Sequence, residues 1–230
     1  MAGGQAILVV EDERVIRDGL CDILSFHGHQ PLGVASGEDG VRQALTGRFS
    51  LILLDVMLPG ISGFDVCRQV RERRPQQAIV LLTALGREDD ILEGFRCGAD
   101  DYITKPFSVA QLVARIEALL RRAGGADPAI PTEPFRFGSW TVDPSARAAS
   151  CRDATHELTS REVLLLALLH AERGRIVSRR RLLAEVWGMQ PAAELQTRTV
   201  DMHIAKLRKK LVGADPGIET VRGEGYRYGG

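Results

Sequence analysis

Acidic side chains stand directly after two short apolar runs in the first quarter of the chain. Glu11 and Asp12 follow the run Ile7–Val10, and Asp55 follows the run Leu51–Leu54. Runs of four aliphatic residues are typical of strands buried inside a parallel sheet. Because open α/β sheets bind ligands at the carboxyl ends of such strands, we expect the three carboxylates to lie close together. Carboxylates are good ligands for Mg2+, which takes one or two of them and keeps several waters.

A hydroxyl and an amine stand at the ends of two further runs. Thr83 ends the run Ala78–Leu82, and Lys105 follows Asp101–Thr104. Either residue alone carries little information, but with the acids they suit a metal ion and a phosphoryl group. Lys105 would neutralise a phosphoryl oxygen as charge builds in the transition state, and Thr83 would donate its hydroxyl to another. The predicted metal ligands are Glu11, Asp12, Asp55 and the backbone carbonyl of Met57.

Strand-like and helix-like patterns alternate over residues 1–122. The predicted strands are Ala6–Val10, Gln30–Val34, Leu51–Leu54, Ala78–Leu82 and Asp101–Thr104. The predicted helices are Glu13–His27, Gly37–Thr46, Ser62–Glu72, Arg87–Cys97 and Val109–Arg121. Alternation at this spacing predicts a parallel sheet covered by helices on both faces. We therefore expect an α/β domain over residues 1–122, a flavodoxin-like (βα)5 doubly wound parallel sheet.

The pattern changes after residues 123–134, a segment rich in Gly, Pro and Ala that we interpret as a linker. Residues 135–230 begin with two predicted strands, Phe135–Val142 and Arg147–Arg152. Three helices are predicted next: Arg161–His170, one capped by Ser178 and ending at Trp187, and Arg198–Leu211. A capping box, Thr159 with Glu162, precedes the first helix. With a final glycine-turned hairpin of Ile218–Val221 and Tyr226–Tyr228, this order predicts a smaller α+β winged helix-turn-helix domain.

The last predicted helix, Arg198–Leu211, is basic on one face and apolar on the other. It contains five basic residues against one acid, and its apolar stripe consists of Val200, Ile204, Leu207 and Leu211. A helix with these two faces suits the major groove of DNA. The predicted DNA-binding residues are Arg198, Thr199, Met202, His203, Lys206 and Lys209 from the helix, and Arg222 from the hairpin.

Individual roles follow from the helical projection. We expect Lys206 at a base edge and Met202 at a thymine methyl group. Thr199 and Lys209 are expected at phosphates, whereas His203 is either a structural residue or a phosphate donor. Arg222, flanked by glycine, would approach a phosphate or the minor groove.

Four motifs in the first domain resemble the receiver domain of bacterial two-component response regulators. They are Ile-Leu-Val-Val-Glu-Asp-Glu, Leu-Asp-Val-Met-Leu-Pro-Gly, Leu-Thr-Ala and Gly-Ala-Asp-Asp-Tyr-Ile-Thr-Lys-Pro-Phe. The resemblance implies that a histidine kinase phosphorylates Asp55 with Mg2+, and that Lys105 and Thr83 take part in catalysis. It also implies a switch in which Thr83 moves toward the phosphoryl group and Tyr102 turns inward. Met57 and Leu85 lie where the family tunes hydrolysis, and both are predicted to shield the acyl phosphate from water.

The second domain is similar to the effector domain of the OmpR/PhoB type within that family. The similarity rests on Arg198–Leu211, Val221–Tyr228, Trp187–Gly188 and Leu158–Glu162. It implies a transcription regulator that binds double-stranded DNA at tandem half-sites. In such relatives the loop corresponding to Gly188–Thr197 contacts RNA polymerase.

The same resemblance implies that phosphorylated receivers form a homodimer. The predicted interface consists of Leu92, Phe95, Asp100, Asp101, Val113, Arg115 and Arg122. Ile91 stands where a basic residue is usual and Gln111 where an acid is usual, so one common ion pair is absent at both ends. Exposed pairs contribute only about 0–1 kcal/mol. We therefore expect the same dimer face, somewhat more apolar.

Two alternatives remain beside a phosphorylation-controlled regulator. A phosphatase of the haloacid dehalogenase type also forms an aspartyl phosphate, but it needs a second Asp at the position of Met57. We therefore expect no enzyme beyond the receiver's own phosphorylation and dephosphorylation. The other alternative is a DNA-binding protein whose receiver dimerises constitutively.

Composition excludes some classes of protein. The formal net charge is zero, and the four cysteines are far apart with no CxxC motif. The first residues lack the apolar segment of a signal peptide, and no apolar run approaches the roughly 20 residues of a membrane helix. The sequence therefore predicts a cytoplasmic protein with reduced thiols and no membrane partner.

Overall fold

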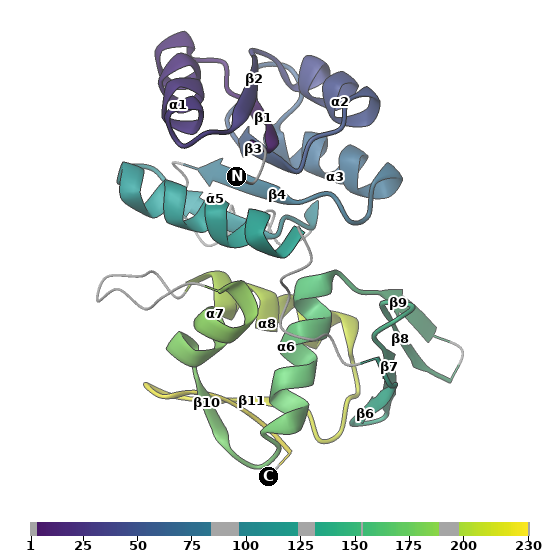
Figure 1. Cartoon of the computed structure of the whole chain (residues 1–230). Coiled ribbons are helices and arrows are strands. Elements are labelled where there is room, and N and C mark those ends of the chain that lie inside the picture. The colour runs from purple at the N-terminus through teal and green to yellow at the C-terminus, as the bar shows by residue number, and fades with distance from the viewer. Residues whose placement is uncertain (1–3, 84–96, 124–131, 153, 189–197, 230) are drawn as a thin grey trace. The chain divides into compact units, whose positions relative to one another are not determined.

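The computed structural model of the chain describes residues 4–83, 97–123, 132–152, 154–188 and 198–229. For residues 121–123 and 198 only the backbone is described. The chain divides into two compact units, Met1–Ala126 and Asp127–Gly230, each with its own sheets and helices (Figure 1). The division falls within the predicted linker at residues 123–134.

The first unit is a parallel sheet with helices on both faces. Its strands are β1 (Ala6–Val10), β2 (Gln30–Val34), β3 (Leu51–Asp55), β4 (Ile79–Thr83) and β5 (Asp101–Thr104). Its helices are α1 (Arg14–Phe26), α2 (Gly37–Thr46), α3 (Gly63–Arg73) and α5 (Val109–Ala123). All neighbouring strands pair in parallel, in the order β2-β1-β3-β4-β5. The flavodoxin-like doubly wound sheet is thus confirmed, while the predicted helix Arg87–Cys97 lies almost wholly outside the described residues.

Alternation along the central strands divides the apolar core into two clusters. Ile7, Val9, Leu51 and Leu53 face α1 and α5, whereas Leu8, Val10, Ile52 and Leu54 face α2 and α3. Figure 1 shows the two helix pairs on opposite sides of the sheet. Because the inner strands are apolar on both faces, as parallel strands require, their carboxyl ends are held in fixed register. This register brings Glu11 and Asp12, which follow β1, to the same edge of the sheet as Asp55, which ends β3.

In its described residues, the second unit contains two antiparallel sheets and three helices. One sheet has the order β6-β7-β8-β9 and consists of Phe135–Phe137, Trp140–Asp143, Ala148–Cys151 and Ala154–Glu157. The other has the order β10-β12-β11 and consists of Ile176–Ser178, Gly225–Tyr228 and Ile218–Val221. The helices are α6 (Ser160–Ala171), α7 (Arg179–Trp187) and α8 (Arg198–Lys210).

Side-chain caps begin α6 and α7 where the sequence predicts them. Thr159 accepts a hydrogen bond from the Glu162 amide, and the Glu162 side chain accepts one from the Thr159 amide, which completes the capping box. The Ser178 hydroxyl caps α7 by accepting from the Arg181 amide, and Gly188 ends this helix in a left-handed conformation with φ 68°.

One strand prediction in the second unit was wrong, and two strands were missed. The predicted strand Phe135–Val142 is two strands, because the chain reverses at Gly138, whose φ is 60°. The strands β9 and β10 were not predicted at all. Both are short, and β9 is largely exposed, so the sequence carries little apolar alternation there.

Within the described residues, no helix is both long and apolar enough to cross a membrane.

Candidate functional site

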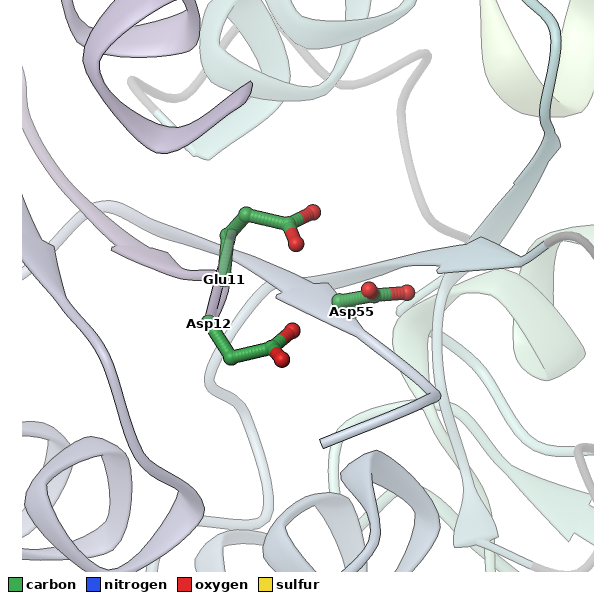
Figure 2. Close-up of side chains that lie close together, drawn as sticks. All are labelled: Glu11, Asp12 and Asp55. Carbon is green, nitrogen blue, oxygen red and sulfur yellow. The ribbon is translucent and has the colours of Figure 1, made fainter. Parts of the chain in front are cut away.

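Three carboxyl groups converge at the carboxyl ends of β1 and β3. Glu11, Asp12 and Asp55 each offer an oxygen within 4.8 Å of the others (Figure 2). Glu11 and Asp55 are buried, whereas Asp12 is exposed. β1 and β3 are neighbours in the sheet. The chain continues from β1 to β2 on one side of this pair, and from β3 to β4 on the other. Doubly wound sheets bind ligands at the carboxyl ends of two such strands.

Backbone contacts fix the peptide groups that carry the acids. The Glu11 amide donates to the Val34 carbonyl at 3.1 Å, which ties the end of β1 to β2. At the end of β3, the Met57 amide points toward Asp55 Oδ1 at 3.4 Å. Gly63, the first residue of α3, lies so close to Asp55 that an added Cβ would be 2.0 Å from the Asp55 carbonyl oxygen. A glycine is therefore required for α3 to start beside Asp55.

Lys105 bridges two of the three acids. Its Nζ donates to Glu11 Oε2 at 2.9 Å and to Asp55 Oδ2 at 3.0 Å. Burial alone lowers the pKa of Lys105, but the hydrogen bonds and charges of the two acids raise it above its usual value. Burial raises the pKa of Glu11, and the charge of Asp55 adds to this although Lys105 acts against it. The site thus contains more negative charge than its one amine offsets.

The donor set suits a hard cation. All three groups supply carboxylate oxygens, and the exposed Asp12 leaves one side open to the water that Mg2+ retains. Met57 is 59% exposed, and its predicted shielding of the acyl phosphate stays a prediction. The predicted ligands Glu11, Asp12 and Asp55 are therefore brought together; participation of the Met57 carbonyl stays a prediction.

The two predicted switch residues lie on neighbouring strands. Thr83 is buried at the end of β4, and its carbonyl accepts from the Lys105 amide at 2.7 Å. The Tyr102 ring packs against the core cluster of the α2–α3 face, with its hydroxyl 3.9 Å from Cys97 Sγ. Burial raises the pKa of Tyr102 well above its usual value. Tyr102 thus points inward, but a change of its position on phosphorylation stays a prediction. Leu85 lies outside the described residues.

In the second unit, a buried carboxylate joins α6 to α8. Glu162 is fully buried, and its Oε2 accepts from Lys210 Nζ at 2.8 Å while its Oε1 lies 3.2 Å from Lys206 Nζ. Burial alone would raise the pKa of Glu162, but the charges of Lys206 and Lys210 lower it to about 2. The sequence showed the capping role of Glu162 and not this second role, although the spacing of the two lysines puts them on one helix face.

A second polar cluster joins α7, α8 and the hairpin. Asp201 Oδ1 accepts from Arg179 Nε at 2.7 Å and from the Tyr226 hydroxyl at 2.5 Å. The Arg179 guanidinium also lies 4.8 Å from the centre of the Tyr226 ring. On the hairpin side, Arg208 donates to the Ile218 carbonyl and to Thr220. These contacts hold the basic helix and the hairpin in one arrangement.

Several residues of α8 that were predicted to contact DNA do not lie on the face of the helix that the projection gave them. Val200, Ile204, Leu207 and Leu211 are buried as expected, but Thr199, Met202 and His203 are buried as well. Thr199, which was expected at a phosphate, is thus buried. The predicted outward position was wrong for Met202, because α8 is covered by more than one neighbour. It was also wrong for Lys206, whose side chain is only 17% exposed and pairs with Glu162.

Lys209 and Arg222 are exposed, as DNA contacts require, and the side chain of Arg198 is outside the described part of the chain. For His203, the structural reading is the one the geometry favours: its Nδ1 lies 3.0 Å from the Thr199 carbonyl and its ring packs edge-on against Trp187.

Three residues of the predicted dimer face have partners inside their own unit. Arg115 Nη1 contacts both carboxyl oxygens of Asp101, at 2.9 and 2.8 Å, and both side chains are buried. Asp100 accepts from Arg71 at 2.9 Å and from the Ile79 amide at 2.9 Å. Val113 is also buried. Leu92 and Phe95, and the side chain of Arg122, lie outside the described residues, so the interface stays a prediction.

Comparisons with known proteins agree with this architecture. Residues 7–117 match the family model for the response regulator receiver domain, and residues 153–228 match the model for the C-terminal domain of transcriptional regulatory proteins. The chain is 41% identical over 226 residues to the phosphate regulon transcriptional regulatory protein PhoB of Klebsiella pneumoniae, covering 96% of each chain. It is 36% identical over 229 residues to the sensory transduction protein RegX3 of Mycobacterium tuberculosis, covering 98% of this chain and 99% of the relative.

A solved structure leads to the same class. The response regulator DrrB of Thermotoga maritima, an OmpR/PhoB homologue, is 31% identical and covers 99% of this chain and 100% of its own, with a TM-score of 0.52. The chain therefore belongs to the two-component response regulators of the OmpR/PhoB family. It is a phosphorylation-controlled transcription regulator with a receiver and a winged-helix DNA-binding domain, and these domains imply a histidine kinase and DNA as partners.

Proposed function

We propose that Asp55 accepts a phosphoryl group from a histidine kinase at a Mg2+ site formed by Glu11, Asp12, Asp55 and the Met57 carbonyl. One observation carries the proposal: Lys105 Nζ lies within 3.0 Å of both Glu11 and Asp55, beside a third carboxylate. The bound Mg2+ would supply Lewis-acid neutralisation of phosphoryl oxygens.

The residues of the chain divide the chemistry among them. A carboxyl oxygen of Asp55 forms the bond to phosphorus, while the bond from phosphorus to the kinase histidine breaks and its electron pair stays on the histidine nitrogen. Lys105 neutralises negative charge on the phosphoryl oxygens, for which its Nζ already lies 3.0 Å from the nucleophile. The Thr83 hydroxyl then donates to a phosphoryl oxygen, and Tyr102 follows behind it as the switch residue.

Phosphorylation at Asp55 then promotes pairing of receiver units and tighter promoter binding. Two linked DNA-binding units occupy tandem half-sites, because binding of the first raises the effective concentration of the second. RNA polymerase is the further partner, through the segment Gly188–Thr197.

The direct test is chemical phosphorylation of the full chain. Incubation with phosphoramidate and Mg2+ should add one phosphoryl mass, measured by intact mass spectrometry, and EDTA should prevent it. Gel filtration of the same samples should give a larger species only when the adduct is present. A protein that is equally dimeric before and after phosphorylation would support a constitutive receiver dimer, and one that forms no adduct would exclude the proposal.

Lys209 offers a test of the DNA-binding face. Lys209→Ala should reduce the slope of log affinity against log salt concentration by about one, because one phosphate contact is lost. Fluorescence anisotropy with a promoter fragment between low and moderate salt measures this slope. Arg136→Ala, which removes an exposed arginine of β6, is the matched control and should leave the slope unchanged. An unchanged slope for Lys209→Ala would remove this residue from the interface.

A further inference from the structure

One arginine of α1 contacts the backbone of both residues of the acid pair. Arg17 Nη1 donates to the Glu11 carbonyl at 2.8 Å and to the Asp12 carbonyl at 3.0 Å. The two carboxylates that project from these peptides belong to the acid cluster at the ends of β1 and β3. Arg17 therefore contacts the back of the proposed metal site and none of its predicted ligand atoms.

The position of Arg17 is itself fixed by β2. A Cβ added to Gly33 would lie 3.0 Å from Arg17 Cγ and 3.2 Å from Arg17 Cδ, so the arginine stem packs directly over this strand. The next residue of β2, Val34, accepts the hydrogen bond from the Glu11 amide. The backbone at Glu11 and Asp12 is thus held on both sides. The Glu11 amide is bound by β2, and the carbonyls of Glu11 and Asp12 are bound by Arg17.

We propose that Arg17 is a positioning residue for the Mg2+ site. Asp12 is exposed, and Arg17 donates to its carbonyl, so this guanidinium helps to set the direction from which the Asp12 carboxylate leaves the backbone. Groups that orient metal ligands without touching the metal typically change metal affinity by a factor of ten or more when removed. The inference rests on the proposed function, because it concerns the same site.

Charge and positioning predict opposite results for Arg17. A positive charge near a cation site disfavours the cation, so its removal would tighten Mg2+ binding if charge alone mattered. If positioning matters, Arg17→Gln and Arg17→Lys should both weaken binding, because neither side chain provides the guanidinium that spans the two carbonyls. Lysine keeps the charge, so this pair of variants separates the two effects.

Isothermal titration of Mg2+ into the full-length, unphosphorylated protein is the measurement. We expect Kd for Mg2+ to rise about tenfold in both variants. The rate of phosphorylation by phosphoramidate should fall at low Mg2+ and recover at saturating Mg2+. Arg14→Gln is the matched control: Arg14 lies on the same helix, is exposed, pairs with Asp18 and should leave Kd unchanged.

Gly33→Ala provides a second way to disturb the contacts of Arg17 with the two carbonyls. The added methyl group would press on the Arg17 stem, and on Cys21 Sγ at 3.2 Å, without removing the guanidinium. We expect a smaller rise of Kd in the same direction. This variant keeps the inference testable if Arg17→Gln proves too unstable to titrate.

The outcomes separate this inference from the proposed function. Wild-type protein that binds no Mg2+ overturns both. Wild-type protein that binds Mg2+, with Arg17 variants that keep the same Kd or bind more tightly, overturns only the role of Arg17. Variants that melt earlier but keep the wild-type Kd assign Arg17 a purely structural part.

Discussion

Asp55→Asn protein should take up no phosphoryl group and should bind its promoter with the same affinity whether or not phosphoramidate is present. The amide is nearly the same size as the carboxylate, so the register of β3 is preserved while the nucleophilic oxygen is lost. Asp55 is buried and contacts Lys105 at 3.0 Å, so Asn should still fill the site. Because the charge of Asp55 contributes to the raised pKa of Glu11, the variant should also lower that pKa.

Intact mass spectrometry and promoter-binding titrations with and without phosphoramidate measure the two effects. Asp39→Asn is a matched control, since Asp39 is a surface acid of α2 that pairs with Arg42 and is not one of the three clustered carboxylates. The control should be phosphorylated like the wild type. An Asp55→Asn protein that still gains a stable phosphoryl mass, or whose DNA binding still responds, would place the acceptor elsewhere.

Glu162→Gln should destabilise the second unit by about 2–4 kcal/mol at neutral pH, because it leaves the charges of Lys206 and Lys210 beside a neutral, buried amide. The pKa of this carboxyl falls from 4.5 to about 2 in the folded protein. A shift of this size corresponds to stabilisation on the order of 3 kcal/mol. A depressed pKa stabilises the fold above about pH 4.5, and this stabilisation is lost as the pH falls toward 2.

Denaturant unfolding followed by tryptophan fluorescence reports on this unit, since both tryptophans, Trp140 and Trp187, belong to it. The difference between wild type and Glu162→Gln should shrink as the pH is lowered from about 4.5 toward 2. Glu185→Gln removes an exposed acid of α7 that pairs with Arg181, and should cost less than about 1 kcal/mol. Equal effects of the two variants would contradict a special role for Glu162.

The acid site was predictable from sequence because the ends of buried parallel strands can be located from the apolar runs. Each inner strand is apolar on both faces, so its length and end are visible as a run, and the residue after the run lies at the carboxyl edge. Glu11, Asp12, Asp55 and Lys105 were located in this way, and their contacts confirm that they meet. Arg17 was not found, because a side chain that contacts backbone carbonyls leaves no pattern in residue types.

The DNA-binding face was predicted less well, for a related reason. Helical projection assumes one buried side, whereas α8 is buried by α7, by the polar cluster with the hairpin, and by Glu162 of α6. Thr199 and Met202 are consequently buried although they lie outside the apolar stripe. Helical projection placed Lys206 opposite the apolar stripe, at a base edge, but a buried acid far away in sequence provides a partner that periodicity cannot indicate.

Asp101 and Arg115 already satisfy each other inside one receiver unit. If two copies met through these side chains, the buried ion pair within each copy would first have to break. Arg115 of one copy would then have to pair with Asp101 of the other. Such an exchange leaves the number of ion pairs unchanged, so it would add little to affinity. The exchange would instead contribute selectivity between partners. A different receiver domain that lacks the matching acid or base could not form the intermolecular pair, and one buried charge would remain unpaired.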